Sequence, residues 1–469
     1  MTERLRSGVD AVGLSQELYF RTPKSLQSGL ITLYGLVRSR KRYGGDYADI
    51  HAEIDASRGL SAGDRARWLN LRLTRILIDA AATVPYYRRL FSQLNVDPRT
   101  MSGPALLERL PILSKADVRA NGAALLAAGQ RPFWTTETSG STGTPLTIAL
   151  DAYAYRLSMA LLARHEADHG ISSNDRRATF AGRLLQLLDD DRPPFWRFNW
   201  AERQMLCSSY HMSDRNLPAY LDALERFQPV ELIGYPSAIY ALADFGRRAN
   251  RRVRLPLRAV ITNSETLLDW QRPVIEQCLG APVYDYYGTA ESVVFAAQCH
   301  HLRYHADPLM GITEVLDDDG RPVASGQAGR LVCTTTSNRM MPLFRYEIGD
   351  TVIPLDSECE CGRPGPVWQA VVGRTDDVVI TPDGRPIGRL DHVFKGVHGI
   401  RECQIAQTAP DRLVLRVVPD VGYSAELADR LRTNARERVG SHMSIDVRIV
   451  DAIARTSRGK FRGVVREFS

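Results

Sequence analysis

The spacing of apolar positions changes along the chain and predicts differently built parts. Up to about residue 130, apolar residues recur every three or four positions, most clearly over 66–82, which predicts a helical lead-in over residues 1–130. From there to about residue 290, short apolar runs alternate with helical stretches, which predicts βαβ units around a largely parallel sheet. The predicted strands here are 146–150, 230–234, 259–262 and 283–287, and the predicted helices are 153–169 and 237–249.

Short strands separated by turns replace this pattern in the last third of the chain. Apolar runs at 312–315 and 329–336 flank a turn at 317–320, which predicts an antiparallel β subdomain at about 295–373. Beyond it the sequence predicts a turn at 382–384, a strand pair within 402–418, a helix over 425–439 and a strand over 445–450. The predicted fold class is α/β, with a large N-terminal domain over 1–373 and a small, mobile α+β C-terminal domain over 374–469.

Composition places the chain among ordinary globular proteins. It has 469 residues, of which 44% are hydrophobic and 24% charged, so more than one domain is expected. The formal net charge of +6 is small, and no basic stripe interleaved with aromatics indicates nucleic-acid binding. No apolar run has the length of a membrane span and no apolar signal core follows the first residues, so we expect a cytoplasmic protein.

A dense run of hydroxyl and glycine residues, TSGSTGTP over 138–145, indicates a phosphate-binding loop. Small residues let backbone N–H groups approach phosphate oxygens, and the hydroxyl groups add further donors. The run lacks the Gly-Lys-Ser/Thr ending of a Walker loop. Taken alone, an ordinary surface turn explains it as well.

Further segments with nucleotide-binding chemistry follow this loop in the sequence. DYYGTAE over 285–291 combines aromatic rings with a carboxylate, and FRYEIGD over 344–350 ends on an aspartate suited to ribose hydroxyls. GRTDD lies at 373–377 and SRGKF at 457–461. Each has an ordinary structural explanation, but chance does not readily account for all of them in this order.

In this order, the segments resemble those of the adenylate-forming superfamily of acyl-CoA synthetases and adenylation domains. The chain is most similar to its phenylacetate-CoA ligase branch, through VPYYR at 84–88 and LPILSK at 110–115. The later part, with QIAQ at 404–407 and SRGKFR at 457–462, looks closer to the capsule-biosynthesis-type and deazaflavin-cofactor adenylyltransferase relatives. The similarity covers nearly the whole chain.

The resemblance assigns roles to matching residues. It implies that Lys460 is catalytic and bridges the carboxylate and the α-phosphate, that Glu291 binds Mg²⁺, and that Asp350 and Arg374 hold the ribose. Tyr287 is expected to pack on adenine. The full nucleotide-binding set implied is Thr138, Ser139, Gly140, Ser141, Thr142, Gly143, Ser264, Glu265, Tyr286, Tyr287, Gly288, Thr289, Asp350 and Arg374.

The implied chemistry suits these residue types. A carboxylate that attacks the α-phosphorus of ATP meets a polyanion, so charge neutralisation and in-line positioning matter more than a general base. The resemblance implies an AMP-forming ligase that uses Mg²⁺ and ATP to convert a small carboxylic acid to an acyl-adenylate. The acceptor of the acyl group is then a thiol, coenzyme A by default, or an amine.

Two alternatives to this ligase remain open. One is an adenylyltransferase that moves AMP to a hydroxyl-bearing cofactor or metabolite, and the other is a non-catalytic nucleotide-binding member of a biosynthetic assembly. A homodimer is allowed for as the assembly state.

The sequence departs from the family pattern at two places. Thr144 stands where many relatives carry lysine, which removes a positive charge from the pyrophosphate side. After 373–377, a hairpin-like turn replaces the short strand and glycine that open the pantetheine tunnel in acyl-CoA ligases. Adenylation is therefore the firmer expectation than thioester formation, and Asp376 is the expected hinge residue. Tyr235 in GYPS at 234–237 is expected to border the acyl pocket.

Cysteine and histidine spacing suggests a second site. Cys299, His305, Cys359 and Cys361 form Cys-x₅-His followed by Cys-x-Cys, a donor set that suits tetrahedral Zn²⁺. The resemblance implies that such a zinc is structural. His300 or His301 can take the place of His305 in this pattern, and reduced surface cysteines are the alternative to a metal site. The odd total of seven cysteines argues against a disulfide framework.

Overall fold

The computed structural model describes residues 16–137, 146–183, 185–187, 190–374, 379–380, 382, 386–387, 390, 393, 399–420, 422–440, 443–455 and 461–468. The chain divides into two compact units. Unit 1 comprises residues 1–174, 198–203 and 284–371, and unit 2 comprises residues 175–197, 204–283 and 372–469. Unit 2 thus groups the C-terminal residues with 175–283, and the predicted domains 1–373 and 374–469 stay a prediction.

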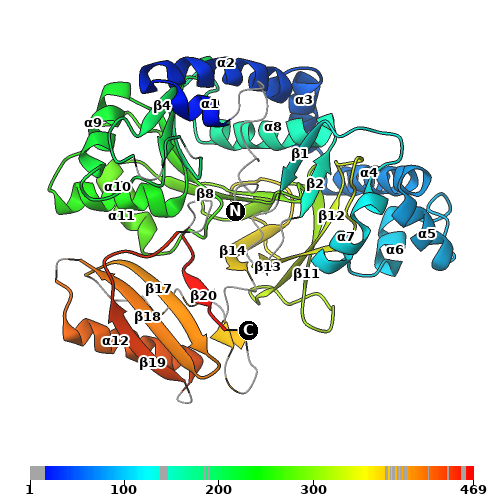
Figure 1. Ribbon diagram of the computed structural model, residues 1–469. Helices are drawn as coiled ribbons and strands as arrows, with labels where there is room; N and C mark the ends of the chain where they lie inside the picture. Colours follow the sequence, from blue (N-terminus) through cyan, green and yellow to red (C-terminus); the bar gives the residue numbers. More distant parts are fainter. Residues whose placement is uncertain are drawn as a thin grey trace. The chain divides into compact units, whose positions relative to one another are not determined.

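Unit 1 opens with the predicted helical lead-in. Its α4 runs Ala62–Thr83, begins where Ser61 accepts a hydrogen bond from the Asp64 amide, and buries Leu73, Ile76 and Leu77 on one face. These apolar residues recur at helical spacing, which explains why the helix forms and which face it buries. The other helices of this part are α1 (Gln16–Arg21), α2 (Lys24–Tyr43), α3 (Tyr47–Arg58), α5 (Pro85–Gln93), α6 (Gly103–Arg109) and α7 (Lys115–Asn121). A short 3₁₀ helix, η1 (Gly122–Leu125), follows, and α2 and α3 both pack against α8 (Ala152–Asp168), as Figure 1 shows.

Antiparallel strands make up the sheet of unit 1, in the order β11-β12-β13-β14-β10-β9-β8. Their bounds are β8 (Val283–Gly288), β9 (Phe295–Gln298), β10 (Tyr304–Ala306), β11 (Gly311–Leu316), β12 (Gly329–Thr335), β13 (Tyr346–Leu355) and β14 (Val367–Arg374). The pairs β11/β12, β12/β13, β10/β14, β9/β10 and β8/β9 are antiparallel, which confirms the antiparallel β subdomain expected in this region.

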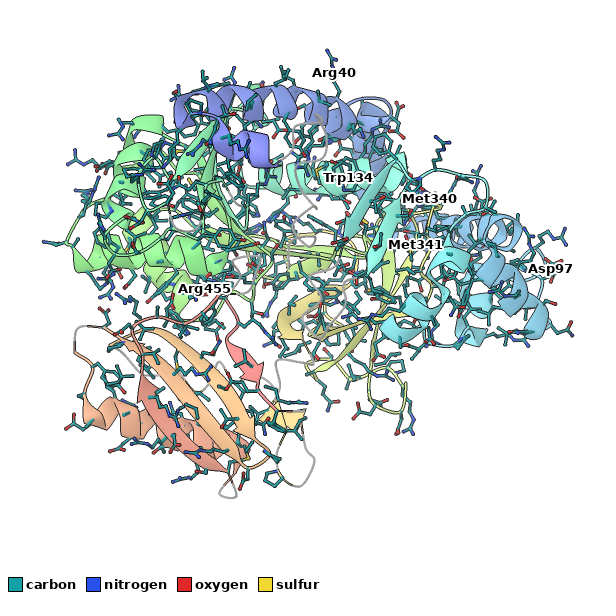
Figure 2. All side chains as sticks on the ribbon, in the orientation of Figure 1. Arg40, Asp97, Trp134, Met340, Met341 and Arg455 are labelled. Atoms are coloured by element: carbon teal, nitrogen blue, oxygen red, sulfur yellow. The ribbon has the colours of Figure 1, made fainter. Side chains whose placement is uncertain are left out.

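A separate hairpin of β1 (Trp134–Glu137) and β2 (Thr147–Leu150) joins the same core. Asn338 donates from Nδ2 to the carbonyl oxygens of Ala149, at 2.9 Å, and Met341, at 3.1 Å. Met340 and Met341 are 2% exposed within this core and lie beside the hairpin (Figure 2). The hairpin is therefore fixed to the sheet of unit 1 through a buried side chain that satisfies two backbone groups.

Unit 2 contains the predicted parallel βαβ arrangement. Its strands β7 (Ala259–Thr262), β6 (Glu231–Gly234), β3 (Arg177–Ala181) and β5 (Gln204–Ser208) are neighbours in that order, and the pairs β3/β5, β3/β6 and β6/β7 are parallel. The accompanying helices are α9 (Leu217–Phe227), α10 (Pro236–Arg248) and α11 (Gln271–Leu279). β4 (Trp196–Asn199) and the 3₁₀ helix η2 (Trp200–Glu202) lie where the chain passes between the units.

The C-terminal part of unit 2 forms a sheet of its own, in the order β19-β18-β17-β20. The antiparallel pair β17 (Ile400–Ala409) and β18 (Arg412–Pro419), helix α12 (Ala425–Val439) and strand β19 (Ser444–Ile449) confirm the elements predicted here. The short strands β15 (Val379–Ile380) and β16 (Pro386–Ile387) pair antiparallel, and β20 (Val464–Arg466) adds parallel to β17. Leu415, Leu431 and Ala435 lie in the core that α12 shares with this sheet.

Among the helices of the described residues, none combines the length and the apolarity that a membrane crossing requires.

Candidate functional site

Two tyrosine–carboxylate hydrogen bonds cross between β8 and β13 in unit 1. The Tyr287 hydroxyl donates to Asp350 Oδ2 at 2.5 Å, and the Tyr346 hydroxyl donates to Glu291 Oε1 at 3.0 Å. Tyr346 and Asp350 share the buried face of β13, because alternate residues of a strand point the same way. Tyr287 lies on β8, and Glu291 lies three residues after its end. Each segment thus contributes one tyrosine and one carboxylate, and we call these four residues the crossed pair.

Burial fixes the protonation of the two tyrosine hydroxyls. Glu291 and Asp350 are 5% and 7% exposed. Burial raises the pKa of Tyr287 well above its usual range, and the Asp350 charge and hydrogen bond raise it further. The pKa of Tyr346 is raised by burial first and then by Glu291. Both phenols therefore stay protonated and donate to the carboxylate oxygens.

Glu291 has the properties of a metal-binding carboxylate. Within the described part of the chain it forms no ion pair, and the Tyr346 hydroxyl donates to it. Nearby in sequence, the buried Thr289 hydroxyl has no hydrogen-bond partner among the described residues. A buried anion without a cation is costly, so a divalent ion with oxygen preference suits the position.

The lead-in segment 110–115 lies against β13 beside these carboxylates. The Leu113 amide donates to the Arg345 carbonyl at 2.9 Å, and the Glu347 amide donates to the Leu113 carbonyl at 3.0 Å. Gly349, next to Asp350, has φ of 85°, and a Cβ there would lie 3.4 Å from Lys115 Nζ. Lys115 therefore lies against β13 at Gly349, a placement that sequence reasoning missed because only tertiary pairing creates it.

The predicted phosphate loop and several other site residues lie outside the described residues. The strands on either side of this segment are in register, with Glu137 opposite Thr147. Lys460 and Asp376 are not described, and of Arg374 only the backbone, at the end of β14, is described. The roles of these residues stay predictions.

Tyr286 and Tyr287 lie on opposite faces of β8. The Tyr286 ring stacks on Phe295 at 5.4 Å between ring centroids and also contacts His165 at 6.2 Å. Tyr287 instead packs against the core that contains Trp368. Adjacent residues of a strand alternate in this way, so the structure brings Tyr287, but not Tyr286, to Asp350.

In unit 2, Glu265 connects the predicted acyl-pocket loop to the C-terminal segment. Its Oε2 accepts the Ser237 amide at 3.2 Å in the first turn of α10, and its Oε1 accepts the Phe461 amide at 2.6 Å. Burial raises the pKa of Glu265, and the hydrogen bonds from Ser237 and Phe461 oppose that rise. A carboxylate at a helix N-terminus is a stabilising arrangement, and here it also holds the residue that follows Lys460.

The backbone around this loop is closely constrained. Gly234 has φ of 147°, and a Cβ there would lie 1.9 Å from the Phe180 carbonyl oxygen, so only glycine fits. The Tyr235 amide donates to that same carbonyl at 2.9 Å, and the Tyr235 side chain is 7% exposed. Ser264, at φ of 67°, takes the left-handed conformation just before Glu265. These features fix the backbone conformation at Tyr235 and immediately before Glu265.

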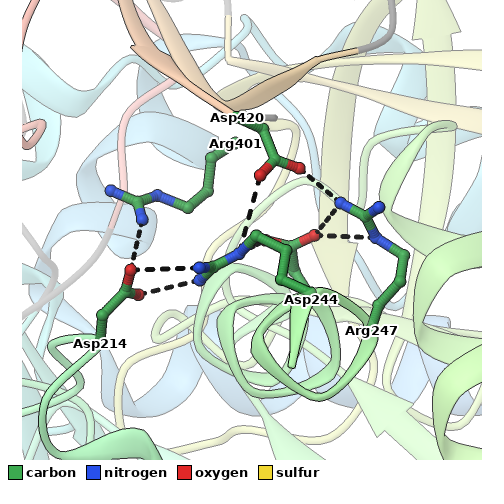
Figure 3. A network of polar contacts seen from close by, with 6 residues as sticks. Asp214, Asp244, Arg247, Arg401 and Asp420 are labelled. Carbon is green, nitrogen blue, oxygen red and sulfur yellow. Dashed lines mark hydrogen bonds and ion pairs between the residues drawn. The ribbon is translucent and has the colours of Figure 1, made fainter. Parts of the chain in front are cut away.

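An alternating network of arginine and aspartate joins α10 to the β17–β18 sheet of unit 2 (Figure 3). Asp244, on α10, is fully buried and accepts from Arg247 at 2.6 Å and from Arg248 at 2.9 Å. Arg247 also donates to Asp420 at 2.5 Å, and Arg401 pairs with Asp214 at 2.6 Å. Because each buried carboxylate is paired, the network satisfies its own charges and leaves no site for a ligand.

The predicted metal ligands do come together. The ligand atoms of Cys299, His305, Cys359 and Cys361 all lie within 4.8 Å of one another. Cys299 Sγ is 3.7 Å from Cys359 Sγ, and Cys361 Sγ is 3.2 Å from His305 Nε2. Bonds of about 2.3 Å from zinc to sulfur imply a tetrahedral edge of about 3.8 Å, so the spacing fits a bound ion and is too long for a disulfide.

Neighbouring groups support the cluster and settle which histidine joins it. The Arg363 amide donates to Cys361 Sγ at 3.4 Å, and the Gly362 amide donates to the Cys359 carbonyl at 3.0 Å. His300 and His301 contact each other, with ring centroids 4.2 Å apart, and neither belongs to the cluster. His305 holds its place because β10 pairs with both β9 and β14, a pairing that spacing alone does not reveal.

Comparisons with known proteins bear on the whole chain. Residues 379–467 match the family model of the CapK C-terminal domain. Protein CapK of Staphylococcus aureus is 23% identical over 454 residues, which span 95% of this chain and 98% of that protein. A phenylacetate-coenzyme A ligase of Thermus thermophilus is 27% identical over 317 residues, which span 66% of this chain and 70% of the ligase.

Solved structures share the fold. The 2-hydroxyisobutyryl-CoA ligase in the postadenylation state, in complex with R3-HIB-AMP, has a TM-score of 0.67 at 23% identity, covering 87% of this chain and 91% of that chain. The same ligase in an open conformation, with 2-HIB-AMP and CoA, has a TM-score of 0.54 at 22% identity, covering 87% and 93%. The chain therefore has the mixed α/β fold of acyl-CoA ligases, as predicted.

The Glu265 contact makes a direct prediction about the C-terminal segment. Glu265→Ala removes the acceptor for the Phe461 amide, so this amide should exchange with deuterium about tenfold faster, as expected for loss of a charge-assisted hydrogen bond. The exchange of the peptide that contains Phe461 measures this by mass spectrometry. Glu225→Ala, a matched change on α9, should leave it unaltered, and unchanged exchange in Glu265→Ala would contradict the contact.

Proposed function

Because the chain is a homologue of CapK and of phenylacetate-coenzyme A ligases, with the fold of the acyl-CoA ligases of the adenylate-forming superfamily, we propose that it is an AMP-forming ligase. The observation that carries the proposal is the crossed pair in which Tyr287 and Tyr346 hold Asp350 and Glu291. This pair offers two buried, oriented carboxylates in a fold shared with a ligase whose solved structure contains an acyl-adenylate.

In the proposed reaction, a carboxylate oxygen of the acid attacks the α-phosphorus of ATP. The bond to the bridging oxygen breaks, pyrophosphate leaves, and an acyl-adenylate remains. The acceptor, a thiol or an amine, then attacks the acyl carbon and releases AMP. The first step gathers negative charge at the α-phosphate, so the protein's task is to position and neutralise it.

The described residues have defined tasks in this proposal. Asp350, oriented by the Tyr287 hydroxyl, accepts hydrogen bonds from the ribose hydroxyls. Glu291, oriented by the Tyr346 hydroxyl, is the ligand for Mg²⁺. When bound, Mg²⁺ neutralises the phosphate oxygens. We further assign the bridge between carboxylate and α-phosphate to Lys460, whose neighbour in sequence, Phe461, donates its amide to Glu265.

The proposal also assigns a pocket for the acid and an acceptor for the acyl group. The acid pocket is assigned to the loop around Tyr235, whose aromatic ring suits a small carboxylic acid, and coenzyme A is the default acceptor because the relatives include coenzyme A ligases. The division into a nucleotide- and substrate-binding part up to residue 373 and a C-terminal lid over 374–469 is part of this proposal, and the CapK C-terminal match over 379–467 supports it.

One observation favours a second function, adenylyl transfer to a hydroxyl group. The strands β15 and β16 form an antiparallel hairpin directly after the boundary, where acyl-CoA ligases open a path for pantetheine. Incubation with ATP and acceptors separates the two functions. A ligase releases free AMP together with an acylated thiol or amine, whereas an adenylyltransferase yields a product that carries AMP.

For the cysteine–histidine cluster we propose structural Zn²⁺. Three thiolates and the imidazole of His305 complete a tetrahedral set with no open position, so the ion would tie β9, β10 and the segment before β14 together and take no part in the reaction.

Lys460→Ala tests the ligase mechanism. The variant loses the positive charge that stabilises the transition state, so carboxylate-dependent release of pyrophosphate should fall about 100- to 1,000-fold, while ATP affinity changes little. Coupled detection of pyrophosphate and calorimetric titration of ATP measure the two effects. The control Lys24→Ala, at the start of α2, should retain full turnover. Undiminished turnover in Lys460→Ala would overturn the mechanism.

Removal of a metal ligand tests the zinc site. The purified chain should contain about one zinc ion, and Cys361→Ser should lose it and melt about 5 °C lower, because the metal-binding free energy contributes to folding. Cys278→Ser, a half-buried cysteine outside the cluster, is the matched control and should keep its zinc. Metal content by mass spectrometry and thermal unfolding provide the readouts, and equal zinc content in both variants would refute the assignment.

A further inference from the structure

Helix α2 turns polar groups toward unit 1. Its buried residues are Gln27 and Gly35. The hydroxyl groups of Ser28 and Thr32 accept backbone amides of the segment 198–200, at 3.1 and 3.2 Å. A surface helix usually buries its apolar residues and exposes its polar ones, so the contacts of α2 with this segment are the reverse of the usual pattern.

The outward face of α2 is apolar. Leu26, Leu33, Leu36 and Val37 are 61%, 50%, 52% and 39% exposed. With about 3.6 residues per turn, positions 26, 33, 36 and 37 lie on one side of the helix, and we call these four side chains the apolar stripe. Trp200, whose amide bonds to the same helix, is 58% exposed. Exposed apolar side chains that gather on one face indicate a surface that another molecule covers.

Positive charge continues the apolar stripe at the C-terminal end of α2. Residues 19–43 contain six lysines and arginines and no aspartate or glutamate. Arg40 and Lys41 are both exposed, and Arg40 extends outward from the helix (Figure 2). Lys41 Nζ lies 5.6 Å from the centroid of the Phe133 ring, and neither cation forms an ion pair within the described ranges.

The carboxylates close to α2 in contact or in sequence do not neutralise these two cations. Glu202, in η2, accepts from Arg42 at 3.1 Å. Asp46 accepts from Arg156 at 2.6 Å, and Asp49 is exposed on the first turn of α3. The surface around the apolar stripe therefore keeps a positive charge that can attract an anionic partner.

This combination of groups favours a lipid surface over a second copy of the chain. At a bilayer interface, leucine and tryptophan side chains enter the acyl boundary, while lysine and arginine remain among anionic head groups. Two copies packed through the apolar stripe would instead bring two basic surfaces together, and residues 19–43 offer no carboxylate to pair with them.

We propose that α2 binds the surface of an anionic membrane. The helix lies in the plane of the interface, with the apolar stripe at the acyl boundary and the charges of Arg40 and Lys41 among the head groups. The chain is thereby held at the membrane surface without crossing it. This binding does not depend on the proposed ligase reaction.

Co-sedimentation of the full chain with lipid vesicles tests the proposal. Binding to vesicles of equal parts phosphatidylcholine and phosphatidylglycerol should be about tenfold or more tighter than binding to pure phosphatidylcholine, because each of the two cations gains from the anionic surface. Added salt should weaken this binding. No binding to the mixed vesicles, or equal binding to both kinds, would overturn the proposal.

Substitutions in the apolar stripe locate the contact. Leu33→Gln combined with Leu36→Gln should weaken binding to the mixed vesicles about tenfold or more, because two apolar side chains no longer leave water. Leu71→Gln is the matched control, since Leu71 is 70% exposed on α4, and its binding should equal that of wild type. Binding at wild-type strength by the double variant would place the contact elsewhere and overturn the proposal.

Substitutions of the two cations test the electrostatic part. Arg40→Gln combined with Lys41→Gln should lose most of the preference for phosphatidylglycerol, whereas Arg67→Gln, at a 79% exposed position on α4, should keep it. A full preference in the double variant would contradict the proposed orientation.

Sedimentation equilibrium of the lipid-free chain examines the other occupant. Wild type and the variant with both leucine substitutions should have the same molecular mass in solution. A wild-type dimer that these substitutions dissociate would assign the apolar stripe to a second copy and overturn the proposal.

Discussion

The hydrogen bonds from two buried tyrosines to two buried carboxylates are the constraint on which the site in unit 1 depends. Tyr287 and Tyr346 sit four residues from Glu291 and Asp350 respectively, and each donates to the carboxylate that belongs to the other segment. Without these donors, Glu291 and Asp350 would be buried carboxylates that lack their tyrosine hydrogen bonds, which is costly. The phenols lower that cost and orient both carboxylates, so the same contacts stabilise the fold and shape the site.

Unit 2 depends on a comparable buried carboxylate. Glu265 accepts amides from Ser237 and Phe461, residues 28 and 196 positions away in sequence. Gly234 makes this geometry accessible, because any side chain there would collide with the Phe180 carbonyl. The segment that precedes Phe461 carries the lysine to which we assign the charge bridge, so this carboxylate relates the proposed acid pocket to the proposed catalytic residue.

Much of the fold could be predicted because local patterning decided it. Helix α12 occupies the predicted residues 425–439, and α8 and α10 begin and end within one residue of their predictions, since their apolar residues recur at helical spacing. Strand β20 was missed because its three residues are half-buried or exposed and show no alternation; pairing with β17 alone makes it a strand. The placement of Lys115 likewise arises from the pairing of 110–115 with β13, and the contact of Tyr346 with Glu291 arises from tertiary packing. The choice of His305 over His300 and His301 comes from the pairing of β10. The phosphate loop and Lys460 lie outside the described residues and stay predictions from resemblance.

The central claim is that the crossed pair holds Mg²⁺ and ATP, and calorimetric titration of ATP with and without Mg²⁺ tests it most directly. Glu291→Gln should weaken binding of Mg·ATP about a hundredfold while leaving the weaker, Mg²⁺-free binding unchanged, because it removes the metal ligand alone. Tyr346→Phe, which only releases the orientation of Glu291, should weaken Mg·ATP binding about five- to tenfold, and Tyr43→Phe, on the exposed end of α2, should have no effect. Wild-type affinity for Mg·ATP in both Glu291→Gln and Tyr346→Phe would contradict the account.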